Sequence, residues 1–184
     1  MRTASGDSTA ESWGDGARCP VTLAGLLGVT LFAVFIVFAR LNSEEDWVPI
    51  LDSANLAIHE AGHPLVGLLS NRLMVYGGTL FQLLFPALVA FHYLRRYEAL
   101  GLAFGLVWLG ESLLNVARYM ADARAQVLPL VGGGEHDWTE IFFRWGVLDN
   151  DTRIAGFTAF LGWGLILATL IWLFKVWLAD SRLT

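Results

Sequence analysis

Long apolar segments without charges constrain the fold of this chain more than any other feature of its sequence. The first covers residues 21–39, and Arg40 ends it. A helix needs about 20 apolar residues to cross a bilayer, so this segment is long enough. Inside lipid every backbone polar group has to be bonded within its own segment, which favours helices. The sequence therefore predicts a helical integral membrane protein.

The predicted fold class is all-α: a polytopic membrane helix bundle of about five transmembrane helices. The expected spans lie at residues 21–39, 48–69, 77–94, 99–120 and 154–178. Residues 21–184 form one membrane-embedded domain in this interpretation, and residues 1–20, rich in Ser, Gly and Ala, form a disordered tail. Composition agrees, since 55% of the 184 residues are hydrophobic and only 16% are charged.

Charge and residue usage indicate which partner and which membrane to expect for this protein. The sequence has no basic cluster of the kind that binds nucleic acid, so the lipid bilayer is the expected partner. Eleven of the twelve basic residues are Arg, a bias typical of GC-rich bacterial genomes. We therefore expect an integral protein of the bacterial cytoplasmic (inner) membrane.

The connection at residues 121–153 is long for a small bundle, and such connections are usually functional or disordered. Several of its apolar residues fall on one side of a helix, namely Trp138, Ile141, Phe142, Trp145 and Leu148. This spacing predicts a short amphipathic helix in the membrane interface. The run from Asp137 to Glu140 fits a capping box, so Asp137 is expected to cap this helix rather than to bind metal.

The motif His59-Glu60-Ala61-Gly62-His63 lies in the second apolar segment. Residues four apart share one face of a helix, so the two imidazoles can converge on a metal ion. Glu60 is then placed to accept a proton from metal-activated water. An ionisable residue at bilayer depth costs about 2.5–3.5 kcal/mol on insertion scales, so three within five positions indicate a function. The alternative is a hydrogen-bonded polar patch between packed helices.

Two polar stripes accompany the motif. One consists of Asp52, Asn55, His59 and His63, and the other of Glu111, Asn115, Arg118 and Asp122. Neither stripe can face lipid, so each is expected to face protein or a water-filled cavity. Because one span separates the two helices, they are expected to run parallel and side by side. An interhelical hydrogen-bond network is the alternative explanation.

A catalytic zinc site needs a third protein ligand, with water in the open position. Pro64 and the neighbouring glycines predict a kink or an end of the helix near the motif, which would bring His63 close to the end of the fourth span. Asp122 lies at that end, and the glycines at 132–134 can turn the connection back towards the bundle with His136. The third ligand is predicted to be Asp122 or His136, and Glu111 is the outside candidate.

A His-Glu-x-Gly-His helix in a small polytopic protein resembles the site-2 protease family of intramembrane zinc metallopeptidases. The resemblance implies that His59 and His63 bind zinc and that Glu60 is the acid/base. In that family a downstream Asn-x-x-Pro-x-x-x-x-Asp-Gly helix supplies an aspartate as the third ligand. Here Asn115 and Asp122 are seven apart, with no proline between them and no glycine after. Only the short motif and the general architecture match.

The leading functional hypothesis is a membrane-embedded zinc metallopeptidase that hydrolyses a peptide bond of a membrane-protein substrate with zinc-activated water. The alternative is a non-catalytic membrane protein, either a partner of other subunits or an assembly factor, whose metal or buried polar network is structural. The two hypotheses differ in the role of Glu60. A hydrolase requires Glu60 for catalysis but not for metal binding, whereas a structural metal site requires only the metal ligands.

Overall fold

The computed structural model describes residues 19–43, 46–131 and 136–182, and this part of the chain contains helices and no strands. Four of the described helices are long and apolar enough to cross a membrane. They are α2 (Leu23–Asn42), α4 (Met74–Arg95), α5 (Ala99–Ala121) and α7 (Asp151–Ser181), which follows the short 3-10 helix η1 (Leu148–Asn150). The predicted class, an all-α polytopic membrane bundle, is confirmed. Residues 1–18 of the expected tail and the glycines at 132–134 lie outside the described residues.

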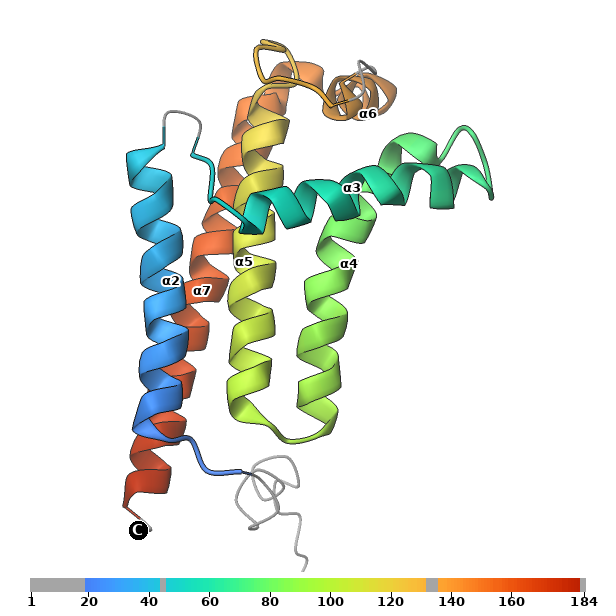
Figure 1. Ribbon diagram of the computed structural model, residues 1–184. Coiled ribbons are helices and arrows are strands. Elements are labelled where there is room, and N and C mark those ends of the chain that lie inside the picture. Colours follow the sequence, from blue (N-terminus) through green and yellow to red (C-terminus); the bar gives the residue numbers. More distant parts are fainter. Residues whose placement is uncertain (1–18, 44–45, 132–135, 183–184) are drawn as a thin grey trace, which may run out of the picture.

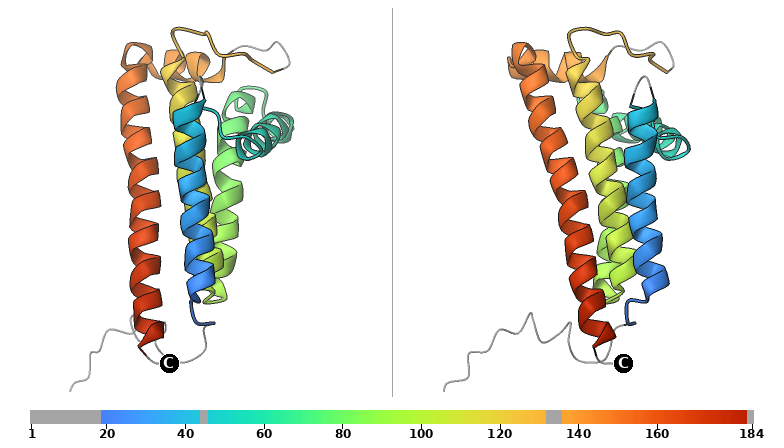
Figure 2. Two further views of the ribbon diagram at one scale, coloured as in Figure 1. Left: turned by 60° about the vertical axis from the view of Figure 1, so that its left-hand side comes forward. Right: turned by 90° about the vertical axis from the view of Figure 1, so that its left-hand side faces the viewer.

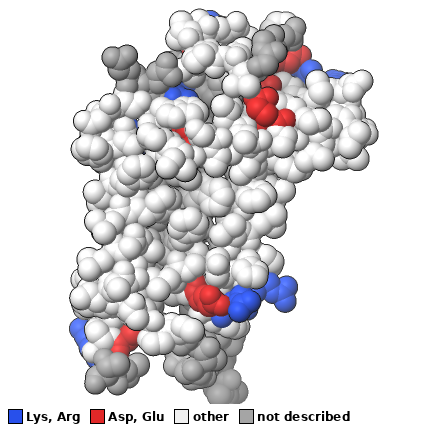
Figure 3. All heavy atoms as spheres, in the orientation of Figure 1, with Lys and Arg blue, Asp and Glu red and all other residues white. Residues whose placement is uncertain are grey.

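The four long helices stand side by side with α5 among the other three (Figure 1). Helices α5 and α7 cross at two glycines: a Cβ atom on Gly110 would lie 3.0 Å from the carbonyl oxygen of Gly162. At one end of the bundle the backbone N–H of Val21 donates to Asp180 at 2.7 Å, which ties the start of α2 to the end of α7. A broad belt without charged side chains separates the two charged ends of the face in Figure 3.

The motif-bearing segment forms a helix, α3 (Leu51–Gly67), but this helix is not a fifth upright span. It runs across α5 and α4 near one end of the bundle, and Figure 2 shows it almost end-on while the long helices remain upright. The expectation of two parallel helices side by side was therefore wrong. The physical reason is that α3 has only 17 residues, with Asp52, Asn55 and His59 buried on one face, so it lies across the bundle with that face towards α4 and α5. It also continues through Pro64 to Gly67 rather than ending at the proline.

The connection after α5 contains the expected amphipathic helix, α6 (Asp137–Trp145), which packs against α4 and α5 at the same end of the bundle as α3. Of the apolar residues of α6, Trp138, Ile141 and Phe142 are buried, while Trp145 remains exposed. Two contacts hold the connection in place. The Asp122 carboxylate accepts from the backbone N–H groups of Val127 and Leu128, and Arg124 donates two hydrogen bonds to Asp151 at 2.7 and 2.8 Å. Helices α3 and α6 therefore frame a site at this end.

Candidate metal centre

Three side chains from two helices converge where α3 passes beneath α6. Oδ2 of Asp137 lies 2.9 Å from Nε2 of His59 and 3.2 Å from Nε2 of His63. One ligand atom from each of the three residues lies within 4.8 Å of the others, and the group could hold a metal ion. The two imidazole rings are 4.9 Å apart between centroids, as expected for residues four apart on one face of a helix. The group is largely buried, with His63 the most accessible of the three.

The other nitrogen of each ring faces a hydrogen-bond acceptor. Nδ1 of His59 lies 3.2 Å from Oε1 of Gln82, and Nδ1 of His63 lies 2.9 Å from the backbone carbonyl oxygen of Met74. Gln82 is itself held by Asn115, to which its amide donates at 2.8 Å. An acceptor at Nδ1 keeps the proton on that nitrogen, so the lone pair of Nε2 points into the site. Partners of this kind fix the orientation of metal-binding histidines.

Three acceptor atoms therefore meet at one point. In the neutral imidazoles both Nε2 atoms carry lone pairs, and the carboxylate oxygen of Asp137 is also an acceptor. Such a group needs a cation between its members, either a proton or a metal ion. Two nitrogens and one oxygen at this spacing suit a transition metal such as zinc.

In the metal-free protein a proton takes the place of that cation. The hydrogen bond that protonated His63 donates to Asp137 raises the pKa of His63 from its ordinary 6.5 to about 9, although burial opposes the shift. Burial would raise the pKa of Asp137, but the hydrogen bonds with His59 and His63 outweigh it and lower that pKa. A metal ion that binds here therefore displaces a proton from His63.

The structure groups Asp137 with the motif histidines, in contrast to the expectation that Asp137 would cap α6. The N-cap is His136, whose Nδ1 accepts from the backbone N–H of Thr139 at 3.3 Å. Asp137 is then the first residue of the helix, and its carboxylate is free to point at α3. Its own backbone N–H donates to the Tyr119 hydroxyl at 3.1 Å, which helps to fix its position.

Asp122 and His136, the predicted third ligands, lie together as a separate pair. Nε2 of His136 is 3.3 Å from Oδ2 of Asp122, and burial lowers the pKa of His136. Both side chains also accept hydrogen bonds from backbone N–H groups. Those that Asp122 accepts come from the connection, and the one that His136 accepts comes from the first turn of α6. Glu111, the outside candidate, is fully buried and accepts from Asn55 at 2.7 Å, nearer the start of α3. Among the described residues, the group that could hold a metal contains none of these three.

Two close backbone approaches place the motif. A Cβ atom on Gly62 would lie 2.7 Å from the carbonyl carbon of Gly77, so α3 and α4 touch backbone to backbone inside the motif. At the next residue of α4, a Cβ atom on Gly78 would lie 2.6 Å from Cδ2 and Cε1 of the His59 ring. Gly77 and Gly78 thus leave room for the crossing helix and for the imidazole. Sequence reasoning did not identify this role.

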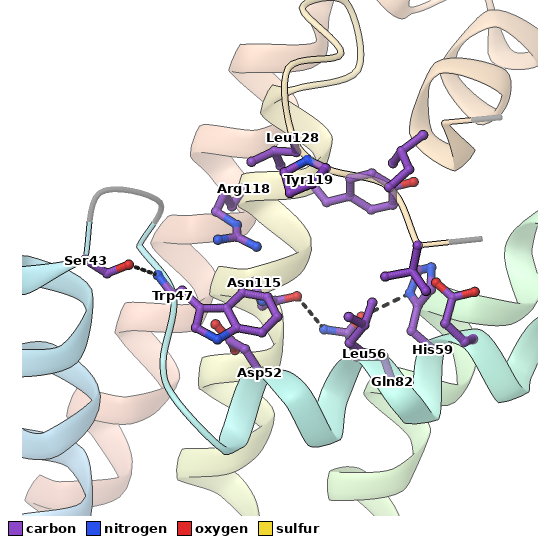
Figure 4. A pocket seen from close by; sticks show the side chains of 14 residues that line it. Ser43, Trp47, Asp52, Leu56, His59, Gln82, Asn115, Arg118, Tyr119 and Leu128 are labelled. Carbon is purple, nitrogen blue, oxygen red and sulfur yellow. Dashed lines mark hydrogen bonds between the residues drawn. The ribbon is translucent and has the colours of Figure 1, made fainter. Parts of the chain in front are cut away.

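Two cavities meet at the candidate centre. The larger, of about 560 Å³, extends from His59 and Glu60 past Gln82 and Asn115 to Asp52 and Trp47, and Figure 4 shows its lining side chains. The smaller, of about 380 Å³, is lined by all three residues of the centre together with Glu140 and Arg144 of α6. Glu60 borders both cavities, next in sequence to His59 but outside the three-residue group. The centre therefore has space for water and for a ligand.

Comparisons with protein-family models, curated proteins and solved structures found no match to this chain.

Proposed function

We propose that this protein is a membrane-embedded zinc hydrolase that cleaves peptide bonds. The observation that carries the proposal is the convergence of acceptor atoms from His59, His63 and Asp137. Two imidazole nitrogens and one carboxylate oxygen suit the three protein ligands of a catalytic zinc site, where water takes the open position. The adjoining cavities, with Glu60 between them, support a catalytic rather than a closed structural site.

Each residue has a separate role in this proposal. His59, His63 and Asp137 hold the ion, while Gln82 and the Met74 carbonyl keep the two imidazoles oriented. A bound zinc ion supplies a Lewis acid that lowers the pKa of water towards 7. Glu60 accepts a proton from water in the cavity and delivers it to the leaving amine.

The position of the centre suggests the kind of substrate. It lies at one end of the bundle, where α3 crosses the spanning helices (Figure 1). The larger cavity is lined by apolar side chains of the connection, including Leu128, Leu130 and Val131. We propose that it receives an extended segment of a membrane protein close to the bilayer surface. The bacterial inner membrane is the proposed location, on the compositional grounds given above.

Glu60→Gln tests the enzymatic role. The nearly isosteric amide cannot accept a proton, so zinc content should be unchanged while cleavage falls by about 10²–10⁴-fold. The matched control is Glu140→Gln, which changes a carboxylate that also borders the smaller cavity but pairs with Arg144. Wild type and both variants would be expressed at equal levels in cells lacking the native gene, and membrane-protein fragments would be compared by mass spectrometry.

Identical fragment patterns for wild type and Glu60→Gln, with zinc present in both, would reject the enzymatic role. The protein would then be a non-catalytic membrane protein whose metal is structural.

A further inference from the structure

A second polar cluster lies away from the metal centre, where the first half of α3 crosses α5. Asp52 is 1% exposed and Glu111 is fully buried. One oxygen of each carboxyl group is accounted for: Oδ2 of Asp52 accepts from the backbone N–H of Val48, and Oε2 of Glu111 accepts from the amide of Asn55, both at 2.7 Å. The other two oxygens, Asp52 Oδ1 and Glu111 Oε1, are buried without a hydrogen-bond donor.

The two carboxyl groups lie within hydrogen-bonding reach of each other. Two carboxylates are both acceptors, so a hydrogen bond between them requires a proton. A single shared proton would satisfy both remaining oxygens at once. Without it, two like charges would be in contact at a buried position, an arrangement in which one of two carboxylates normally stays protonated.

The surrounding charges favour one proton. Arg40 from α2 is the cation that acts on Glu111, and its side chain is only 10% exposed. Arg40 also pairs with Asp46 at 3.6 Å, so it does not by itself balance two further ionised carboxylates. Arg118 from α5 and Glu60 from α3 border the same cavity as Asp52. The two oxygens without donors suit a proton, whereas hard metal cations take about six oxygen ligands.

We propose that Asp52 and Glu111 form a buried proton-binding site that holds one proton at neutral pH and exchanges it with the cavity beside the metal centre. Asp52 and Glu60 both line the larger cavity, and Figure 4 shows Asp52 and His59 among its lining side chains. This cavity is the route by which a proton would pass between the pair and the candidate metal centre. The proposal does not depend on zinc or on peptide cleavage.

Infrared spectroscopy of the full-length protein in lipid nanodiscs tests the proposal. At pH 7 wild type should show a carboxylic-acid C=O band that is lost in both Asp52→Asn and Glu111→Gln, because the new amide donates to the remaining carboxylate in place of the proton. In each variant the amide keeps a hydrogen bond between the two side chains, so we expect the fold to be unchanged. Circular dichroism would verify this by an unchanged helix content. The matched control is Asp151→Asn, which alters a buried aspartate held by Arg124 and should leave the band intact.

Two further conditions complete the test. Transfer of wild type into D2O should shift the band, because the pair exchanges with cavity water; a band that does not shift would overturn that connection. If neither Asp52→Asn nor Glu111→Gln loses a band, both groups are ionised and the proton site is rejected. If the band appears only after sodium is removed from the buffer, the site binds that cation instead and the proposal is overturned.

Discussion

Gly78 on α4 leaves the space that the imidazole ring of His59 on α3 occupies. A Cβ atom at position 78 would lie 2.6 Å from two carbons of that ring, closer than real atoms approach. The neighbouring Gly77 makes the corresponding contact with the backbone of Gly62. The position of a motif histidine is thus set by the absence of a side chain on another helix.

Gly78→Ala should therefore displace His59 and reduce metal binding. Overpacking of this kind costs about 1–3 kcal/mol, and the ring has to move for the methyl group to fit. Zinc affinity measured by competition with a chelator should fall, together with the melting temperature. Gly156→Ala on α7 is the matched control, because a Cβ atom there meets nothing within 4 Å. Equal zinc affinity in the two variants would contradict the proposed packing.

Asp137→Asn should remove the proposed third ligand. We expect zinc affinity to fall by more than the roughly 10–100-fold that is typical of changes outside the ligand shell. Elemental analysis of the purified protein would measure the effect, with about one zinc per chain expected in wild type. Glu140→Gln lies one turn further along α6 and should keep its zinc. Full zinc occupancy in Asp137→Asn would restore Asp122 or His136 as the third ligand.

Gln82→Met should weaken metal binding without touching a ligand. The change leaves the Nδ1–H group of His59 buried without an acceptor, which costs about 1–3 kcal/mol, and zinc affinity should fall about 10–100-fold. Gln126→Met is the control, since that exposed glutamine donates to Thr139 and not to any of the three residues of the candidate group. An unchanged zinc affinity in Gln82→Met would show that Gln82 does not orient His59.

Zinc binding should strengthen as the pH rises. The pKa of His63 is about 9 in the metal-free protein because of its hydrogen bond with Asp137, so zinc competes with a proton. Between about pH 6.5 and 9 the apparent affinity should increase roughly tenfold per pH unit, with about one proton released per zinc near pH 7. Calorimetry in buffers of different ionisation enthalpy measures that number. Binding without proton release would argue against the His63–Asp137 pair.

The His63–Asp137 pair should make the metal-free protein less stable as the pH rises, whereas zinc affinity should increase. The raised pKa of His63 means that the folded state holds the proton more tightly than the unfolded chain does. This contribution to the free energy of unfolding is complete below about pH 6.5 and disappears as the pH rises through about 9. Chemical denaturation of the metal-free protein across this range would detect the loss, and His63→Gln should show less of it.

The sequence predicted much of the architecture because hydropathy reports directly on lipid-crossing helices. Four of the five expected spans are long helices, and the amphipathic spacing around Trp138 and Ile141 located α6. The two polar stripes also meet, through Asn55 and Glu111. Hydropathy does not report the direction of a helix, however, so the second expected span, residues 48–69, looked like a transmembrane segment although it lies across the bundle as α3.

The third member of the candidate metal group could not be found from local patterns. Asp137 is 78 residues from His59, and its neighbourhood fits a capping box that explains the aspartate equally well. Only the cap made by His136 frees the Asp137 carboxylate, and that geometry depends on how α6 sits over α3. The nearest sequence signal is the acidic residue at the start of a helix, which the helix dipole alone would also favour.

The hydrogen bond between Val21 and Asp180 has a consequence for membrane sidedness. It places the start of α2 and the end of α7 at one end of the four-span bundle, and α3 and α6 lie at the other. The candidate metal centre consequently faces the compartment opposite the one that receives those two helix ends. A chelator unable to cross the membrane should strip the metal when added to one side of sealed vesicles and leave it untouched from the other.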